Sequence, residues 1–385
     1  MAEILRMRNP IQHYAWGSRE VLARLQGRPV PNPEPEAELW VGAHPSAPST
    51  VLLDGREQPL DRLVAEDPGA YLPPSVPGDR LPCLLKILAI DAPLSLQVHP
   101  SERQAEEGFE REERAGIPLD DPRRNYKDRS AKPETVVALT GMELLTGVQP
   151  ADRLRATAER LGLEWLRDVV AGGGPAVPAV LGLDDATARD AVARTVDAAR
   201  SAAADDPVAA LVRHVADRHP GDRGLLVALC MNHVRLSPGQ SLHTPARQLH
   251  AYLSGTAVEV MSSSDNVLRA GLTGKHVDVA ELLAVLAEEQ AAPEVVEPPA
   301  DATGARVYPL WDERLGLVSH ELVPGRPVPA VLRGTAMLLV ADGRAAVHAA
   351  DGGWELTGGE SVLHCGDETP VELTGNGRVF TVTVR

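Results

Sequence analysis

The sequence predicts a mainly β protein with an α-helical insert, built as two jelly rolls of the β-sandwich or barrel kind plus one helical domain. Three observations predict this fold. Short apolar runs bounded by Pro, Gly or Asp clusters fill residues 1–149 and return after residue 304, which is typical of β-strands. Apolar residues follow helical spacing between residues 150 and 223. Two segments that lie 120 residues apart also resemble each other.

The N-terminal part of the chain is expected to contribute strands to the first jelly roll. Residues 224–290 should complete this discontinuous domain, because strand-like sequence returns over 225–261. A short helix with Asp278 near its start is expected to follow. The clearest strand-like runs in residues 1–149 are short and apolar: 38–41, 84–90 and 135–139.

Residues 150–223 predict a helical domain inserted between these β segments. Two stretches, 151–170 and 184–219, carry apolar residues at helical spacing, and the second has Asp caps and a Pro at a helix start. A Pro- and Ala-rich linker is expected over 291–304. Residues 305–385 alternate apolar and polar residues between glycine turns, which predicts the second jelly roll.

An internal repeat relates the two β-rich parts at a constant offset of 120 residues. The shared order of turn, strand, loop, strand and turn is typical of a cupin-type jelly roll, with chance similarity of turn-rich sequence as the alternative. His250 of the first copy is Pro370 in the second, so we expect the C-terminal jelly roll to lack metal ligands. The matching pairs are Leu236/Leu356, Gly239/Gly359, Ser241/Ser361, Leu253/Leu373 and Gly255/Gly375.

The overall composition excludes several classes of protein. Acidic residues outnumber basic ones by 54 to 38, and the net charge of −16 argues against whole-surface attraction to nucleic acid or anionic lipid. No stretch approaches the roughly 20 apolar residues that a membrane span needs. Cys83, Cys230 and Cys365 are odd in number and widely spaced, so neither a disulfide framework nor a thiolate zinc site is expected. We therefore expect a cytoplasmic protein without nucleic-acid or membrane partners.

Two short motifs offer side chains that can bind a metal. In SLQVHP, Gln97 and His99 alternate with apolar residues, so both would project from one face of a strand. In AKPETVV, Lys132 and Glu134 are two positions apart, so their side chains would point to the same face of a strand. The proline between them suits the start of a strand at a barrel rim. For either motif alone, a solvated polar face is the simpler interpretation.

A third motif, QLHAYLSGTAVEVM, adds a second histidine. If residues 254–255 form a two-residue hairpin turn, His250 lies directly across from Glu259, and Tyr252 shares their face. A lone histidine on a strand is more often a core or surface residue. The neighbouring carboxylate and phenol make His250 a candidate ligand.

The combined side chains suit a divalent cation. Two imidazoles, one carboxylate and one amide oxygen are typical of a catalytic Zn²⁺ site with room for water, although ligand type leaves Fe²⁺ and Mn²⁺ open. The polar loop that follows carries Arg269 and Lys275, which could bind a phosphate or an enediolate. Asp265 and Asn266 in the same loop could brace it or contact sugar hydroxyls. An ordinary loop with exposed charges is the alternative.

In order and spacing, six segments together resemble the type I mannose-6-phosphate isomerases over essentially the whole chain. The resemblance implies a zinc cupin domain, a helical domain inserted in it, and a second jelly roll. Departures from the family pattern at Gly274, Gln240 and His243 remove neither a ligand nor Arg269. The segments are YAWGS (14–18), AELWVGAHPSAPS (37–49), SLQVHP (95–100), KPE (132–134), LHAYLSG (249–255) and SDNVLRAGLT (264–273).

The resemblance also implies an activity and its residues. The family interconverts mannose 6-phosphate and fructose 6-phosphate, and its catalytic arginine falls on Arg269. One Zn²⁺ per chain is implied, with the ligands Gln97, His99, Glu134 and His250. Residues of the substrate cleft fall on Trp16, Lys86, Lys132, Tyr252, Glu259 and Lys275.

An aldose–ketose isomerisation through a cis-enediolate needs a base and a positive group near the oxyanion. Arg269 is the candidate for the positive group. Glu259 is the candidate base if the hairpin register holds, and a zinc-bound water or a nearby histidine is the alternative. We expect a hexose 6-phosphate as substrate and a monomeric enzyme.

Three other functions remain open from the sequence. A cupin oxygenase could use Fe²⁺ on similar ligands, but lysines around the site would then have no evident purpose. A non-catalytic sugar-binding cupin is disfavoured by the intact ligands and the intact Arg269. An isomerase for a different sugar or sugar phosphate is permitted by the loop departures.

Overall fold

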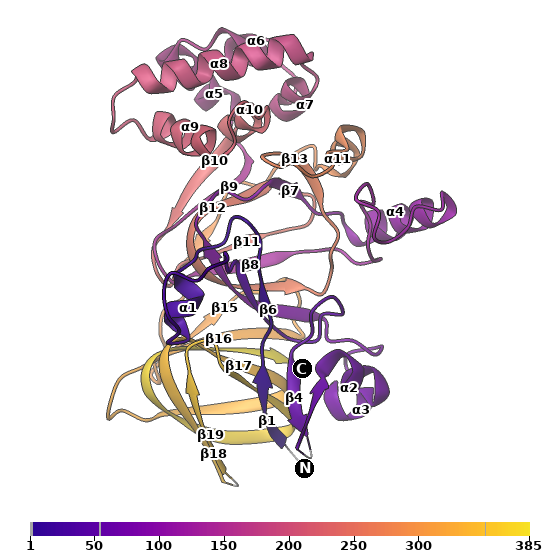
Figure 1. Ribbon diagram of the computed structural model, residues 1–385, viewed down its shortest axis with the longest axis vertical. Helices are drawn as coiled ribbons and strands as arrows, with labels where there is room; N and C mark the ends of the chain where they lie inside the picture. Colours follow the sequence, from indigo (N-terminus) through magenta and orange to yellow (C-terminus); the bar gives the residue numbers. More distant parts are fainter. Residues whose placement is uncertain (1–2, 54, 351) are drawn as a thin grey trace.

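The computed structural model describes residues 3–53, 55–350 and 352–385. Figure 1 shows three stacked parts: helices at one end, a β layer in the middle, and a second β-rich part at the other end. The predicted mainly β fold with a helical insert is confirmed. None of the helices in the described ranges has the length and apolar character needed to cross a membrane.

The middle layer is an antiparallel sheet of eleven strands within the described residues. Its central strand, β12 (His250–Ser262), pairs with four others and connects the two halves of the sheet. The other strands are β2 (Ile11–Gln12), β3 (Glu38–Val41), β6 (Cys83–Ile90), β7 (Leu96–Val98), β8 (Glu134–Ala138), β9 (Met142–Val148), β10 (Met231–Leu236), β11 (Ser241–Thr244), β13 (Leu268–Gly271) and β14 (Val295–Val296).

The second sheet has eight strands in the part of the chain that is described. The long C-terminal strand β19 pairs with β1, and β1 pairs in turn with β4 and β4 with β5, so both ends of the chain meet in one sheet (Figure 1). The strands are β1 (Glu3–Arg8), β4 (Thr50–Leu53), β5 (Arg56–Pro59), β15 (Ala305–Tyr308), β16 (Leu315–Leu322), β17 (Val328–Ala349), β18 (Gly352–Thr357) and β19 (Ser361–Val384).

The sheets do not follow the expected division of the chain at every point. We placed residues 1–149 in the metal-binding domain, yet β1, β4 and β5 belong to the sheet formed mainly by residues 305–385. Leu5 of β1 pairs with Leu363 of β19, and both lie in an apolar core that also includes Leu85 and Ile87 of the middle sheet. Burial of apolar side chains between the two sheets therefore decides where the N-terminal strand pairs. The expected domain boundaries stay a prediction.

The helical insert forms the upper layer of Figure 1 and shares its core with the middle sheet. The expected Asp caps are present: Asp184 and Asp206 accept hydrogen bonds from the first turns of α8 and α9, and Asp278 caps α11. The helices of this part are α5 (Ala151–Leu161), α6 (Glu164–Ala171), α7 (Ala176–Leu181), α8 (Asp185–Ser201), α9 (Pro207–Arg218) and α10 (Gly224–Leu229), followed later by α11 (Val279–Val285).

Two predictions about local structure were wrong. Residues 224–229 are the helix α10 rather than the start of a strand, because an unbroken apolar run has no periodicity that separates helix from strand. The N-terminal β-rich part also holds helices that we did not predict: α1 (Val21–Leu25), α2 (Leu60–Glu66), α3 (Pro68–Tyr71) and α4 (Glu102–Arg114). Helix α4, which projects sideways in Figure 1, has a capping box formed by Ser101 and Gln104.

The predicted hairpin turn at residues 254–255 is also wrong. Strand β12 runs without a break from His250 to Ser262. Gly255 has φ +112°, and a Cβ there would lie 2.6 Å from the carbonyl oxygen of Gly141. At this glycine the strand leaves β9 and begins to pair with β6. The glycine therefore marks a bend between two parts of one sheet.

The first turn of the internal repeat is confirmed. Gly239 and Gly359 both have positive φ, +87° and +81°. Directly after each glycine, the side chain of Gln240 or Glu360 accepts a hydrogen bond from the backbone N–H three residues earlier, at 2.9 Å and 2.8 Å. Strands β11 and β19 then begin at equivalent positions. The resemblance between the copies thus reflects the same local structure.

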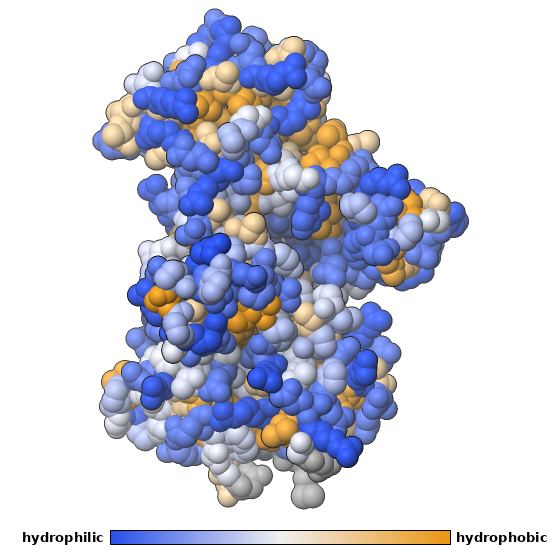
Figure 2. All heavy atoms as spheres, viewed as in Figure 1, coloured by the Kyte–Doolittle hydropathy of each residue, from blue (hydrophilic) through white to orange (hydrophobic). Residues whose placement is uncertain are grey.

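On the face of the molecule in Figure 2, hydrophilic residues cover most of the surface. Apolar residues gather in small groups on the helical insert and beside it. The polar groups that could serve chemistry are instead buried in the middle sheet.

Candidate metal centre

Three of the four predicted ligands meet in the middle sheet. His99 directly follows β7, Glu134 is the first residue of β8, and His250 is the first residue of β12. One ligand atom from each lies within 4.8 Å of the others, and the two imidazole centroids are 5.0 Å apart. All three residues are buried, with at most 4% of their surface exposed. Side chains from distant parts of the sequence are therefore brought together as the metal hypothesis requires.

Backbone carbonyls fix how both imidazoles present their nitrogens. The Nδ1 of His99 lies 2.6 Å from the carbonyl oxygen of Asn266, and the Nδ1 of His250 lies 3.0 Å from that of Gln248. Because a carbonyl oxygen can only accept, each Nδ1 must carry the proton. Each Nε2 then has a lone pair, and these atoms lie 3.3 Å and 3.2 Å from the two carboxylate oxygens of Glu134.

The protonation states also fit a cation. Burial, together with the nearby Lys132 charge, lowers the pKa of His99 to about 4, so this imidazole is neutral at pH 7. Burial would raise the pKa of Glu134, but the Lys132 ammonium at 3.0 Å helps hold it well below its usual range. The Nε2 of His99 is buried without a hydrogen-bond partner. A carboxylate facing two imidazole lone pairs is the donor set that a divalent metal such as Zn²⁺ satisfies.

Gln97, the fourth predicted ligand, lies half-buried on β7. It pairs with His250 of β12 on one side and with Arg269 of β13 on the other. The Nε2 of Gln97 donates a hydrogen bond to the hydroxyl of Ser95 at 3.1 Å, which leaves the amide oxygen available as a ligand. The role of Gln97 as a ligand stays a prediction.

A buried group of charged and hydrogen-bonding side chains lies next to the ligands. Glu259, the predicted base, accepts a hydrogen bond from the hydroxyl of Tyr252 at 2.9 Å, and its other oxygen lies 3.4 Å from the Nζ of Lys86. Burial, reinforced by the charge of Glu134, raises the pKa of Glu259 to about 7. A carboxyl group with a pKa near neutrality can both accept and return a proton. The predicted grouping of His250, Tyr252 and Glu259 is thus realised in part, since Tyr252 contacts Glu259 although no hairpin exists.

Lys86 is held in place from several sides. Its Nζ lies 3.1 Å from a carboxylate oxygen of Glu38 and 5.0 Å from the centroid of the Trp40 ring. Burial would lower the pKa of Lys86, but the carboxylates of Glu38 and Glu259 raise it above its usual value. Lys86 therefore stays protonated at neutral pH, and its ammonium group is fixed beside the proposed base.

Further cationic side chains lie near the ligands. Arg269, on β13, is partly buried and forms no ion pair with any described residue, and burial lowers the pKa of its guanidinium. Lys275 lies 5.9 Å from the centroid of the Tyr14 ring, which stacks on Trp16, and burial followed by the charge of Arg269 lowers the pKa of Lys275. These two cations are available to an anionic ligand.

The structure also brings in residues that we did not single out from the sequence. Glu38 and Trp40 contact Lys86, and Tyr14 lies under Lys275. Glu38 carried a usable signal, because a glutamate inside an apolar strand must find a buried partner. Asp265, which we expected to brace its loop, lies 3.6 Å from the Nε2 of His44.

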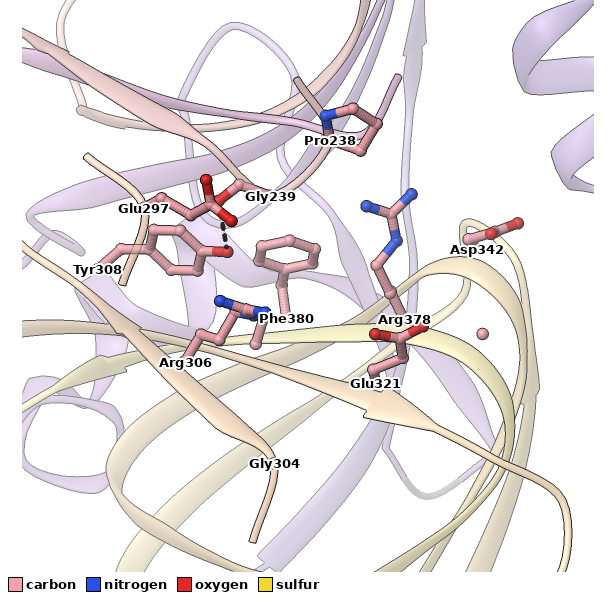
Figure 3. A pocket seen from close by; sticks show the side chains of 12 residues that line it. Pro238, Gly239, Glu297, Gly304, Arg306, Tyr308, Glu321, Asp342, Arg378 and Phe380 are labelled. Atoms are coloured by element: carbon pink, nitrogen blue, oxygen red, sulfur yellow. Dashed lines mark hydrogen bonds between the residues drawn. The ribbon is translucent and has the colours of Figure 1, made fainter. Parts of the chain in front are cut away.

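A separate cavity lies between the two sheets (Figure 3). Its volume is about 330 Å³, and charged and aromatic residues line it. Arg378 donates a hydrogen bond to the carbonyl oxygen of Leu139, and Tyr308 donates one to that of Gly239, so these side chains join the sheets. None of the residues that line this cavity is a predicted site residue.

Comparisons with known proteins agree with the resemblance found in the sequence. A family model described as phosphomannose isomerase type I, catalytic domain, matches residues 4–151. A mannose-6-phosphate isomerase of Salmonella typhimurium is 34% identical, over 97% of this chain and 98% of that protein. The mannose-6-phosphate isomerase of Escherichia coli is also 34% identical, with the same coverage. Mannose-6-phosphate isomerase 2 of Arabidopsis thaliana is 28% identical, over 91% of this chain and 88% of that protein.

Solved structures show the same fold over the whole chain. The mannose 6-phosphate isomerase of Salmonella typhimurium, bound to its substrate fructose 6-phosphate and to zinc, superposes with a TM-score of 0.88 at 31% identity, covering 99% of both chains. A zinc-bound mannose 6-phosphate isomerase superposes with a TM-score of 0.87, with the same identity and coverage.

Proposed function

This chain belongs to the type I mannose-6-phosphate isomerases, and we propose that its buried His–Glu–His cluster is the zinc site at which it interconverts mannose 6-phosphate and fructose 6-phosphate. The observation that carries this proposal is the convergence of His99, Glu134 and His250. Both histidines have their Nδ1 engaged and their Nε2 facing the carboxylate. Gln97 is proposed as the fourth ligand because its strand neighbours are His250 and Arg269.

Zinc held by these residues would polarise the sugar carbonyl and stabilise negative charge on its oxygen. The backbone carbonyls behind both histidines keep the imidazoles oriented toward one point. Lys132, 3.0 Å from Glu134, keeps that carboxylate ionised. One ion per chain is proposed, since the described residues contain one such cluster.

Glu259 is proposed as the base that moves the carbon-bound proton. The reaction takes a proton from C2 of the aldose and delivers it to C1 of the ketose, so one group must accept and then release it. Glu259 has a pKa of about 7 and is 3% exposed, which suits it to both steps in a site that excludes water. The Tyr252 hydroxyl and the Lys86 ammonium hold its two oxygens in a fixed orientation.

Arg269 and the lysines are proposed to bind negative charge. Arg269 has no ion-pair partner among the described residues, and its planar guanidinium can donate two hydrogen bonds to an enediolate. Lys275, beside Tyr14 and Trp16, is proposed to contact the phosphate. Trp16, Lys86, Lys132 and Tyr252 are proposed to complete the substrate site.

The experiment that tests this function is a coupled assay for fructose 6-phosphate formed from mannose 6-phosphate. We expect turnover by the zinc-loaded protein, loss of turnover after chelation, and recovery when zinc is returned. Turnover that persists in protein shown by elemental analysis to be metal-free would contradict the zinc proposal.

The same assay distinguishes the other functions. Oxygen consumption that depends on Fe²⁺ would indicate an oxygenase. Absence of turnover with any hexose 6-phosphate in zinc-loaded protein would indicate a sugar-binding cupin. Faster turnover of another sugar phosphate than of mannose 6-phosphate would show a different substrate preference.

We further propose a monomeric enzyme of the cytoplasm. The buried cluster of His99, Glu134 and His250 is formed within a single chain, so the metal centre requires no ligand from a partner subunit. Cys83, Cys230 and Cys365 are unpaired and buried, which fits a reducing compartment. Light scattering after size exclusion and cell fractionation test the two proposals, and a stable dimer or a secreted protein would contradict them.

A further inference from the structure

Asn266 lies in the segment between β12 and β13 and is fully buried. Its backbone carbonyl oxygen accepts the hydrogen bond from the Nδ1 of His99 at 2.6 Å. This contact sets the imidazole tautomer and the direction in which the ring presents its Nε2. Three residues later the chain reaches Arg269, which pairs with Gln97 on β7. Asn266 thus lies between the proposed metal ligands and the proposed oxyanion-binding arginine.

The side-chain amide of Asn266 is fully hydrogen-bonded to a second segment, residues 127–130. Its Nδ2 donates to the carbonyl oxygens of Asp128 and Ser130, both at 2.9 Å. Its Oδ1 accepts from the backbone N–H groups of Lys127 at 2.7 Å and Asp128 at 3.1 Å. An amide can donate twice and accept twice, so no other side chain of this size replaces it without loss. Residues 127–130 lead directly into Lys132 and Glu134.

Asp128, in residues 127–130, also forms hydrogen bonds with the segment that carries Asn266. The carboxylate of Asp128 accepts hydrogen bonds from the Ser264 hydroxyl at 2.9 Å and from the backbone N–H of Asp265 at 2.8 Å. It also accepts one from the backbone N–H of Ser130 at 2.9 Å. The two segments therefore hold each other in a single arrangement through buried polar groups.

We propose that Asn266 is a positioning residue that sets the zinc affinity of this protein, by fixing His99 through its backbone and the approach to Glu134 through its side chain. This inference rests on the proposed zinc site. Two of the ligands come from different strands, and Asn266 is bonded both to one of them and to the segment that carries the other. Loss of the amide frees residues 127–130 and allows the carbonyl behind His99 to move.

The test compares Asn266→Ala and Asn266→Asp with the unaltered protein in a competition for zinc against a chromogenic chelator. Both variants remove the Nδ2 donors; the aspartate keeps the shape and the Oδ1 acceptor, but places a second oxygen against the carbonyl oxygens of Asp128 and Ser130. We expect zinc to bind about 10-fold to 100-fold more weakly, as is typical when a group behind a metal ligand is lost. The alanine variant serves if the aspartate variant does not fold, which circular dichroism will show.

Asn9→Ala is the matched control. Asn9 is also an asparagine that bridges distant segments: its Nδ2 donates to Gly359 at 3.1 Å and to Ser361 at 2.9 Å, and its Oδ1 accepts from Ser49 at 3.0 Å. It touches neither the ligands nor residues 127–130. We expect this variant to melt at a lower temperature with unchanged zinc affinity.

The outcomes separate the inference from the proposed function. Folded Asn266 variants with unchanged zinc affinity would overturn the inference, and so would an equal loss of affinity in the Asn9 control. If the unaltered protein itself does not compete with the chelator for zinc, the proposed zinc site fails, whatever the variants do.

Discussion

The hydroxyl of Tyr252 donates a hydrogen bond to Glu259 at 2.9 Å and lies 3.4 Å from the metal-ligand candidate Glu134. One phenol thus lies between the proposed base and a proposed zinc ligand. Both carboxylates are buried, so bulk water does not solvate them. The proton affinity of Glu259 should therefore depend on this hydrogen bond.

Replacing Tyr252 with Phe should shift the pH profile of kcat/KM toward higher pH. The hydrogen bond stabilises the ionised form of Glu259, and a bond to a charged group contributes about 1.5–3 kcal/mol. Its loss raises the pKa of Glu259 by roughly one to two units, so less of the base is ionised at pH 7. Steady-state kinetics over pH 5–9 measure the shift; an acid limb that stays in place would show that the bond does not act on the base.

The unaltered enzyme should lose kcat/KM as the pH falls below about 7. The pKa of Glu259 is raised to about 7, and only its ionised form can accept the carbon-bound proton.

Glu259→Gln should lower turnover by about 10²-fold to 10⁴-fold, the usual contribution of a general base, without loss of zinc. Glu143→Gln is the control, since Glu143 lies on β9 in contact with His233 and Arg235. Comparable turnover in the two variants would remove Glu259 from the mechanism.

The ligand candidates could be found in the sequence because each lies in a short motif, but only the resemblance to a known family joined the motifs into one site. Gln97 and His99 alternate with apolar residues; Gln97 lies on β7 and His99 directly follows it. The prediction of a hairpin at Gly255 was wrong because the sequence does not distinguish a glycine at a bend within a strand from a glycine in a turn. Tyr252 and Glu259 nevertheless meet, although they lie on opposite sides of the bend along β12.

The pairing of strands that lie far apart in the chain could not be predicted from the sequence. Nothing local in β1 indicates that Leu5 pairs with Leu363 at the far end of the chain, because this choice depends on the shared core of two sheets. The contact of Glu38 with Lys86 also forms only when β3 and β6 pair. The apolar run that forms α10 has no hydrophobic periodicity that would distinguish a helix from a strand.

Replacing Lys86 with Met should destabilise the fold. The change leaves the carboxylates of Glu38 and Glu259 buried without their cation, and breaking a buried pair in this way costs about 3–5 kcal/mol. Urea unfolding at pH 7 measures the free energy. Adding Glu38→Gln to Lys86→Met should recover part of the loss, because one uncompensated charge is removed; an additive further loss in the double variant would contradict the ion-pair account.

Replacing Arg269 with Ala should lower turnover by orders of magnitude and leave the zinc content intact. The guanidinium forms no ion pair with any described residue, so its removal leaves no buried carboxylate uncompensated. Loss of a donor to a developing oxyanion typically costs about 10²-fold to 10³-fold in kcat. Arg235→Ala, on the solvent-exposed side of β10, is the control. Near-normal turnover in the Arg269 variant would refute its assigned role.

Zinc should stay bound when the pH falls well below the ordinary histidine pKa. A proton competes with zinc for an imidazole only once the pH approaches the pKa of that imidazole, and burial lowers the pKa of His99 to about 4 from an ordinary value near 6.5. Glu134, whose pKa lies well below its usual range, also stays ionised in mild acid. Release of zinc to a chromogenic indicator, followed from pH 7 to pH 4, measures the midpoint, and circular dichroism at each pH shows whether the protein is still folded. A release centred near pH 6.5 in folded protein would contradict the view that the low pKa of His99 controls the release of zinc.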